Sequence, residues 1–217
     1  MSSLLFAAAA GVPMAAGWSL HARRLHRRVE AARRDPLTGL LTRDAFTQRA
    51  TKALAGGRSA VYVIDLNRFK DINDTHGHAA GDAVIAATGR RLTEWAAVNL
   101  GTVARLGGDE FAAVARVLSR ADLCWTLNEL TRAIEQPLTV DGHTLTVGAS
   151  IGAAAYDPAT DDVDLPTLLR LADEQMYAAK RSGAEWLTAL DLTPQSETVN
   201  GRRAGRPGTS GGTEAAS

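Results

Sequence analysis

Two neighbouring carboxylates, Asp109 and Glu110, directly follow the glycines Gly107 and Gly108. Apolar runs of residues that favour β-strands flank them at 101–106 and 111–117, so the sequence predicts a β-hairpin with an acidic turn. Glycine tolerates positive φ and lets a ligand approach the backbone closely. Adjacent carboxylates suit a hard divalent cation with oxygen ligands. An ordinary exposed turn would have similar residues, because turns favour Gly and Asp.

A third carboxylate, Asp65, follows the short apolar strand predicted at 61–64. The chain then turns into a predicted helix, 67–75, and a glycine-containing loop leads to a longer one, 82–97. The carboxyl end of a buried strand before a helix is a common place for metal ions and phosphates. Taken alone, Asp65 would fit the role of a helix cap equally well.

Together these stretches resemble the GGDEF family, the diguanylate cyclases. The signature Gly107-Gly108-Asp109-Glu110-Phe111 is complete, and the run Asp-x-x-x-Phe-Lys-x-Ile-Asn-Asp…Gly-His-x-x-Gly-Asp extends from Asp65 to Asp82. A further motif, Asp-x-Leu-Thr-Gly-Leu-x-Asn-Arg, begins at Asp35, with Thr42 where Asn is usual. The resemblance covers residues 35–191, the predicted GGDEF domain. It implies an α+β, palm-like nucleotidyl-cyclase fold: a βαββαβ core whose mostly antiparallel sheet carries packed helices, with Asp65 beside the hairpin.

The resemblance also implies the reaction, which condenses two GTP into cyclic di-GMP and releases two pyrophosphates. Mg²⁺ (or Mn²⁺), two per active site, would be held by the carboxylates of Asp65 and Asp109 and by the carbonyl of Leu66. Asp109 and Glu110 would be the catalytic acids, with Glu110 in a supporting role. Each subunit would hold one GTP, so turnover would require a homodimer formed through the GGDEF domain.

The substrate-binding residues implied by the resemblance fall into two groups. The guanine edge would be read by Asn73 and Asp82, and Asp82 favours GTP over ATP as the substrate. The triphosphate would be held by the backbone amides at 67–69 and by two lysines. These phosphate-binding residues are Asn67, Arg68, Phe69, Lys70 and Lys180.

Two departures from the family pattern bear on activity. Ala184 stands where the family usually has an arginine that assists the phosphates, and Arg181 nearby is predicted on a different helix face. Residues 98–101 lack both charged residues of the family's Arg-x-x-Asp product-inhibition motif, so no product-inhibition site is expected. The alternative function is therefore a catalytically weak or inactive GGDEF domain that serves as a GTP- or partner-binding signalling module.

The uncharged run 3–20 precedes the basic segment 21–34, which contains six arginines. By length and by the positive-inside rule, 1–20 is predicted as a transmembrane anchor and 21–34 as a basic linker helix. This predicts a single-pass protein of the inner (cytoplasmic) membrane with its catalytic domain in the cytoplasm. A cleaved signal peptide and a soluble helix packing on a partner are the alternatives.

The remaining composition is that of an ordinary globular protein. The 217 residues have a formal net charge of zero, so nothing favours a nucleic-acid partner. Cys124 is the single cysteine and is predicted to be a buried structural thiol. Residues 192–217 are predicted as a disordered tail. The other predicted elements are a helix at 44–54, a helix at 119–136 capped by Ser119, a hairpin at 137–155, a helix at 164–182 and a strand at 185–190.

Overall fold

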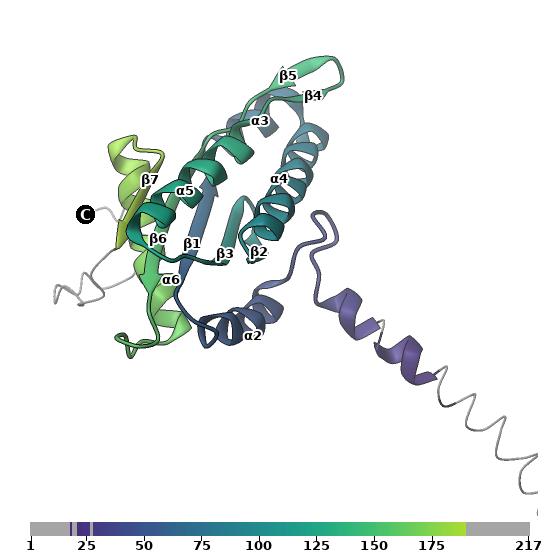
Figure 1. Cartoon of the computed structure of the whole chain (residues 1–217). Helices are drawn as coiled ribbons and strands as arrows, with labels where there is room; N and C mark the ends of the chain where they lie inside the picture. The colour runs from purple at the N-terminus through teal and green to yellow at the C-terminus, as the bar shows by residue number, and fades with distance from the viewer. Residues whose placement is uncertain (1–17, 19–20, 27, 190–217) are drawn as a thin grey trace, which may run out of the picture.

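A computed structural model describes residues 18, 21–26 and 28–189 of the chain. Helices and strands are interspersed along it (Figure 1). The elements are α2 (Arg43–Leu54), β1 (Ser59–Leu66), α3 (Phe69–His76), α4 (His78–Val98), β2 (Thr102–Gly107), β3 (Glu110–Arg116), α5 (Arg120–Glu135), β4 (Leu138–Val140), β5 (His143–Leu145), β6 (Ala149–Tyr156), α6 (Leu165–Ser182) and β7 (Trp186–Ala189).

Strand β1 is the centre of a five-stranded sheet of order β2-β3-β1-β6-β7. It pairs antiparallel with both β3 and β6, while β7 runs parallel to β6, so the sheet is mixed. Seven of the eight β1 residues are buried, and the exception is Asp65. The succession β1, α3–α4, β2, β3, α5, β6 confirms the predicted βαββαβ core.

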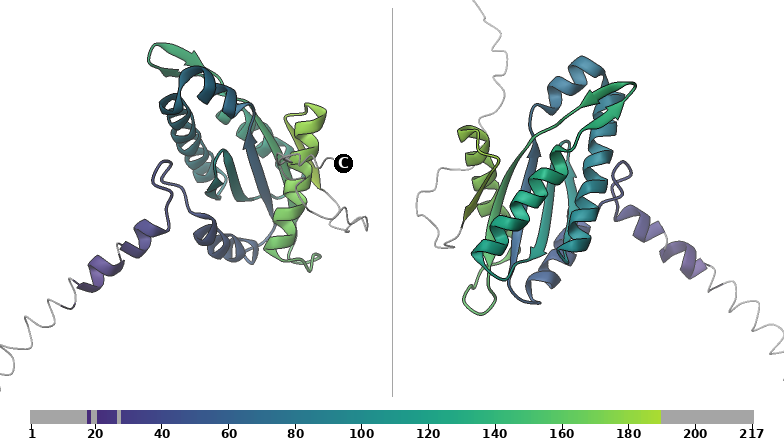
Figure 2. Two further views of the ribbon diagram at one scale, coloured as in Figure 1. Left: turned by 180° about the vertical axis from the view of Figure 1, so that it is seen from behind. Right: turned by 45° about the horizontal axis from the view of Figure 1, so that its top comes forward.

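Helices cover both faces of this sheet, as the views in Figure 2 show. Side chains alternate along a strand, so neighbours in β1 belong to different layers. Tyr62 and Ile64 pack with the layer of α4 and α5. Val61 and Val63 pack with the layer of α2 and α6. Asp65 continues the second series and therefore lies on the face covered by α6.

Helix α6 approaches the sheet very closely at Gly152 of β6. A methyl group there would overlap the carbonyl of Ala172 and the amide of Met176. The helix begins at Asp164, whose side chain accepts a 2.9 Å hydrogen bond from the Thr167 amide. It ends at Gly183, which has a left-handed backbone. These contacts fix the position of the C-terminal turn of α6, which carries Lys180.

Two local predictions need correction. The segment 143–155 is not one strand: its first part, β5, pairs with β4 in a separate two-stranded sheet, and β6 joins the main sheet after a break at 146–148. The Asp141–Gly142 turn is a strong hairpin signal, but it determines only the pairing of the two short strands beside it, β4 and β5. Cys124 is half-buried rather than buried. The predicted cap is confirmed, because Ser119 Oγ accepts a hydrogen bond from the Asp122 amide.

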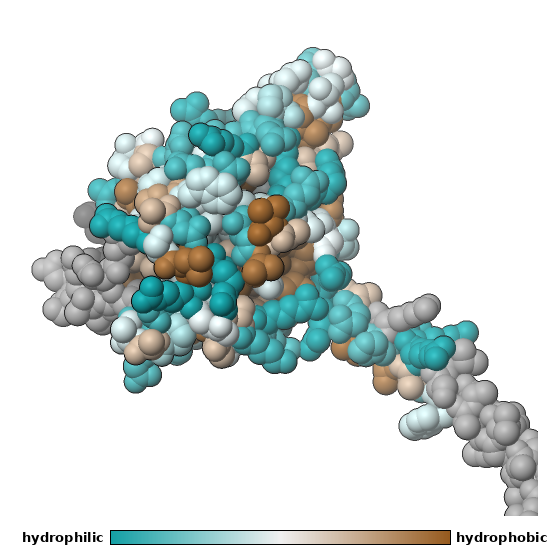
Figure 3. All heavy atoms as spheres, viewed as in Figure 1, coloured by the Kyte–Doolittle hydropathy of each residue, from teal (hydrophilic) through white to brown (hydrophobic). Residues whose placement is uncertain are grey.

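The predicted inner-membrane, single-pass localisation is contradicted. No helix within residues 18, 21–26 and 28–189 is long and apolar enough to cross a membrane. The run 3–20 is at the lower limit of spanning length and rich in alanine, and apart from Trp18 it lies outside the described residues. The helical residues that follow it, 21–26 and 28–32, carry charges and extend away from the domain (Figures 1 and 3). The predicted tail at 192–217 also lies outside the described residues.

Candidate active site

Asp65 and Glu110 face each other across the β1–β3 pair, at the end of the sheet where β1 finishes. Asp109 precedes Glu110 in the turn, and its carbonyl accepts a 3.2 Å hydrogen bond from the Leu66 amide. Because directly opposite residues project from the same face, the carboxylates of Asp65 and Glu110 share one side of the sheet. Like charges so placed repel each other, so this edge favours a bound cation.

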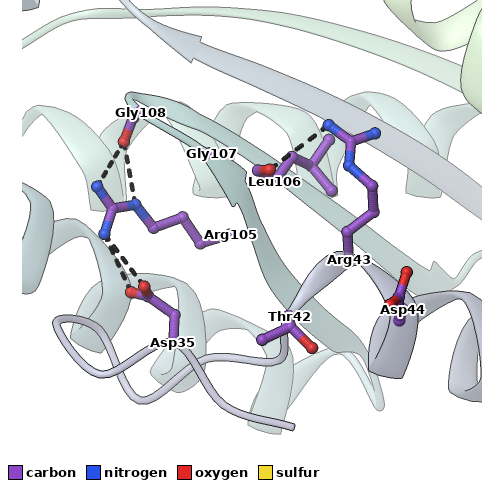
Figure 4. Close-up of a pocket in the computed structure, with 8 residues that line it drawn as sticks. All are labelled: Asp35, Thr42, Arg43, Asp44, Arg105, Leu106, Gly107 and Gly108. Atoms are coloured by element: carbon purple, nitrogen blue, oxygen red, sulfur yellow. Dashed lines mark hydrogen bonds and ion pairs between the residues drawn. The ribbon is translucent and has the colours of Figure 1, made fainter. Parts of the chain in front are cut away.

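The signature turn has a backbone that its glycines permit. Gly107 and Gly108 have φ of +151° and +53°, and the β2–β3 register shifts between Arg105 and Gly107. Two donors of the Arg105 guanidinium, Nε and Nη2, bind the Gly108 carbonyl at 3.0 and 2.8 Å. Its Nη1 binds both carboxylate oxygens of Asp35 at 3.1 and 3.2 Å. Arg105 thus joins the turn to the N-terminal motif (Figure 4).

Asp35 is held by more than Arg105. The amide and hydroxyl of Thr38 both donate to its Oδ1, at 2.9 and 2.7 Å. Burial by itself raises the pKa of Asp35, but the hydrogen bonds from Thr38 and Arg105 outweigh it and bring the pKa below its ordinary value. Asp35 is therefore a charged anchor for the turn.

A cavity of about 450 Å³ opens beside the turn, between the N-terminal motif and the β2–β3 hairpin (Figure 4). Its size is typical of small-molecule sites. Arg43 reaches across it to the Leu106 carbonyl, with 3.5 Å between Nη2 and the oxygen. The signature glycines line this cavity, but the predicted guanine- and phosphate-binding residues do not. Its lining residues are Asp35, Thr42, Arg43, Asp44, Arg105, Leu106, Gly107 and Gly108.

The predicted phosphate-binding segment 67–69 links β1 to α3. Arg68 has a left-handed backbone with φ of +54°, and α3 starts at the next residue, Phe69. The Asn67 amide donates to the Gly148 carbonyl at 2.8 Å, and its side-chain oxygen accepts from Ser150 Oγ at 2.8 Å. Asn67 is thus engaged by the β6 side of the sheet, so its amide would have to leave Gly148 to bind a phosphate. Lys70 is exposed on the first turn of α3.

The predicted guanine-binding residues lie on two adjoining helices. Asn73 is half-buried on α3, and Asp82 is exposed near the start of α4. Gly81, next to Asp82, packs so closely on Asn73 that a methyl group at Gly81 would overlap the Asn73 side-chain oxygen. This contact between α3 and α4 brings the amide of Asn73 next to the turn that carries Asp82.

Lys180 reaches the carboxylate edge from α6. Its Nζ lies 2.5 Å from Asp65 Oδ1, with the lysine side chain 45% exposed and the aspartate side chain 13% exposed. Arg181 instead stacks on the Tyr177 ring, 5.9 Å from its centroid. In this position Arg181 does not replace the arginine that the family usually uses to bind the phosphates, and Ala184 has no charged side chain to do so.

The carboxylate edge fits a hard divalent cation by the chemistry of its donors, which are all oxygens. Within the described residues, no group of three or more His, Cys, Asp or Glu side chains gathers that could hold a metal. Backbone carbonyls and substrate phosphates would have to complete the coordination, as is usual for Mg²⁺.

Three features of this region were not predicted. The Arg105–Asp35 bridge was missed although Asp35 begins a recognised motif and Arg105 lies two residues before the signature. The Ser150–Asn67 contact has no sequence signal. Glu135 faces Glu185, and burial together with that charge raises the pKa of Glu135.

At the position of the missing product-inhibition motif, Val98 and Leu100 are 75% and 78% exposed.

Comparison with known proteins identifies the family. The family profile "Diguanylate cyclase, GGDEF domain" matches residues 32–185. A 19.3 kDa protein in the repSA 5′ region of Streptomyces ambofaciens is 46% identical over 76% of this chain and 87% of its own length. The diguanylate cyclase DgcN of Escherichia coli is 37% identical over 73% of this chain, which spans 40% of DgcN.

A solved structure has the same fold. The coiled coil and GGDEF domain of DgcB from Caulobacter crescentus, in complex with c-di-GMP, superposes with a TM-score of 0.72 at 26% identity. The match covers 82% of this chain and 96% of that one. The matched profile, the relatives and the shared fold agree with the complete signature at 107–111, and the chain belongs to the GGDEF-domain family of diguanylate cyclases.

Proposed function

We propose that this protein condenses two GTP into cyclic di-GMP with release of two pyrophosphates, in a metal-dependent reaction of a homodimer. The observation that carries the proposal is the edge where β1 ends. Asp65, Glu110 and the acidic turn meet there, and Lys180 is bound to Asp65. Phosphoryl transfer between two anionic substrates needs such positioned charge more than covalent catalysis.

In this proposal Asp65, Asp109 and the Leu66 carbonyl would hold Mg²⁺ or Mn²⁺. The bound cation would neutralise phosphate charge and lower the pKa of a coordinated hydroxyl. Asp109 accepts the proton of the attacking 3′-hydroxyl, and Glu110 supports it from the adjoining strand. Arg105 keeps the turn that carries both acids in place.

The substrate is recognised at its two ends. Asn73 and Asp82 offer an amide and a carboxylate to the guanine edge, a pairing that selects strongly because an unmatched polar edge is costly. Lys70, Lys180 and the backbone amides at 67–69 hold the triphosphate. This assignment makes GTP the preferred nucleotide over ATP.

Exposed apolar residues on the N-terminal helix support dimer formation. Leu25 and Val29 are 55% and 47% exposed and four residues apart, a spacing that would place them on one face of a continuous helix. Burying such a face against a second copy would remove apolar surface from water. The solved relative DgcB contains a coiled coil together with its GGDEF domain, which supports the same arrangement here.

The test is product formation by the full chain with GTP and Mg²⁺ at several protein concentrations. We expect cyclic di-GMP to increase more steeply than in proportion to enzyme concentration, because two subunits each contribute one GTP. Asp109→Asn should reduce the rate by about 100-fold or more, since it removes the proposed proton acceptor. Asp173→Asn, an exposed aspartate on α6, is the matched control and should keep the wild-type rate.

Absence of product from the wild-type protein with either Mg²⁺ or Mn²⁺ would contradict the proposal. GTP binding without turnover would then support the alternative, a nucleotide-binding signalling module. The feature that favours this alternative is Ala184, where the chain lacks the usual arginine.

A further inference from the structure

The ion pair between Lys180 and Asp65 joins two residues that bind different ligands in the proposed function. Asp65 is assigned to the cation, and Lys180 to the triphosphate. In the structure Lys180 Nζ lies 2.5 Å from Asp65 Oδ1. An ammonium this close occupies one oxygen of the carboxylate and neutralises its charge. A divalent cation that approaches Asp65 must therefore compete with Lys180.

We propose that Lys180 is an exchangeable counter-ion of Asp65. It binds the carboxylate until a divalent cation replaces it there, and its ammonium then moves to the triphosphate. Cation and nucleotide therefore bind cooperatively. This inference rests on the proposed function, because it uses the same two ligands. It adds a thermodynamic link between them.

Asp65 needs a counter-ion because of its surroundings. Its side chain is only 13% exposed, and Glu110 is its direct cross-strand partner. A half-buried carboxylate beside another carboxylate is costly unless a positive charge compensates it. Lys180 supplies that charge from α6.

Lys180 can be exchanged because its side chain is 45% exposed. Its ammonium stays in reach of water and can leave Asp65 without being buried alone, and lysine carries its charge on a flexible four-carbon stem. The helix itself is fixed: Ala179 is fully buried, and α6 packs against Gly152 of β6. The ammonium can therefore change partner by rotating its own side chain while α6 keeps its position.

The exchange depends on Lys180 in this chain in particular. Ala184 offers no charge, and the guanidinium of Arg181 stacks on Tyr177. A cation that binds alone displaces Lys180 from Asp65, so the ammonium loses that partner. A nucleotide supplies new phosphate partners, so each ligand favours the other by the same factor.

The first measurement is Mn²⁺ binding to the 217-residue chain without nucleotide, monitored through the electron paramagnetic resonance signal of free Mn²⁺. Lys180→Met should bind Mn²⁺ at least about threefold more tightly than wild type, because only the lysine of this ion pair is exposed. Lys70→Met is the matched control: it also removes a proposed phosphate-binding lysine, but not one paired with Asp65, and should change Mn²⁺ binding little. Lys180→Arg keeps the charge and should bind Mn²⁺ as weakly as wild type.

The second measurement is binding of a GTP analogue with a methylene between its α- and β-phosphates, in EDTA. Asp65→Asn should tighten metal-free nucleotide binding, because Lys180 is then released to the phosphates. In the Lys180→Met background the same substitution should give a clearly smaller gain. Circular dichroism checks that each variant is folded.

The outcomes separate this inference from the proposed function. If wild type binds Mn²⁺ and makes cyclic di-GMP, but Lys180→Met binds Mn²⁺ no more tightly than Lys70→Met, the counter-ion exchange is wrong and the cyclase assignment stands. If Asp65→Asn tightens metal-free nucleotide binding equally in the wild-type and Lys180→Met backgrounds, the counter-ion exchange is also wrong. If wild type binds no Mn²⁺ even with the nucleotide analogue, the metal assignment in the proposed function fails first.

Discussion

Arg105 and Asp35, seventy positions apart in the sequence, are joined by a guanidinium–carboxylate pair at 3.1 and 3.2 Å. Their side chains are 17% and 18% exposed, so the pair is largely shielded from water. The same guanidinium holds the Gly108 carbonyl through two further donors. The acidic turn is thus fixed to the N-terminal motif through one side chain.

Replacing Arg105 by lysine should loosen the turn. Lysine keeps the charge but lacks the planar fork that binds Asp35 and Gly108 together. We expect the free energy of unfolding to fall by about 1–3 kcal/mol, the range for hydrogen bonds to charged groups. Cyclic di-GMP formation should also fall, because the position of Asp109 depends on the turn. Urea denaturation and product assays measure the two effects.

The control for that experiment is Arg58→Lys. Arg58 pairs with Asp157 at 2.5 Å, but its side chain is 61% exposed, so its replacement should cost less than about 1 kcal/mol. Equal stability losses in the two variants would show that the Arg105 bridge has no special role.

The stability of the domain should depend on pH through Asp35. Its folded-state pKa is lowered, so its contribution is present above the ordinary carboxyl pKa and is lost as pH falls through the folded value. We expect Asp35→Asn to show a smaller loss of stability than wild type between about pH 5 and pH 3. Urea unfolding across this interval measures the difference. Parallel pH curves for the two proteins would contradict the assignment.

A side chain at Gly81 would require the Asn73 side chain to move. Gly81→Ala would force the methyl group against the Asn73 oxygen, so the unfolding free energy should fall by about 1 kcal/mol, the low end for overpacking, and GTP binding should weaken. In an Asn73→Ala background the obstructing oxygen is gone. There the same substitution should be neutral or stabilising by up to about 1 kcal/mol, because alanine favours helix over glycine. A double-mutant cycle by denaturation tests this, and additive effects would contradict it.

Restoring an arginine at position 184 should strengthen nucleotide binding. Ala184 is half-buried just after α6, close in sequence to Lys180. We expect Ala184→Arg to lower the dissociation constant for the methylene GTP analogue by about tenfold, the value of one good charge-assisted contact to phosphate. Ala184→Gln provides similar length without charge and should change the affinity little. Equal affinity of both variants would mean that position 184 does not reach the phosphates.

Local signals in the sequence predicted much of the fold. Ser119 was identifiable as a helix cap, and the strand ending at Asp65 follows from its apolar run. Contacts between distant residues could not be predicted this way. Lys180 and Asp65 are 115 positions apart, and no local sequence pattern indicates that α6 packs against β1. The break between β5 and β6 was missed because the apolar run is continuous there, while the tertiary structure requires a crossing from one sheet to another.

The distance along the chain between Asp65 and Lys180 also orders the events of synthesis. A ribosome completes β1, the acidic hairpin and α3 well before it reaches α6. Until α6 is released, Val61 and Val63 lack one of the two helices in their layer, and Asp65 lacks its ammonium. A nascent chain of this protein therefore leaves part of an apolar strand face uncovered beside an unneutralised Asp65, a combination that exposes it to aggregation. Its last long helix closes the core and the active site in the same step.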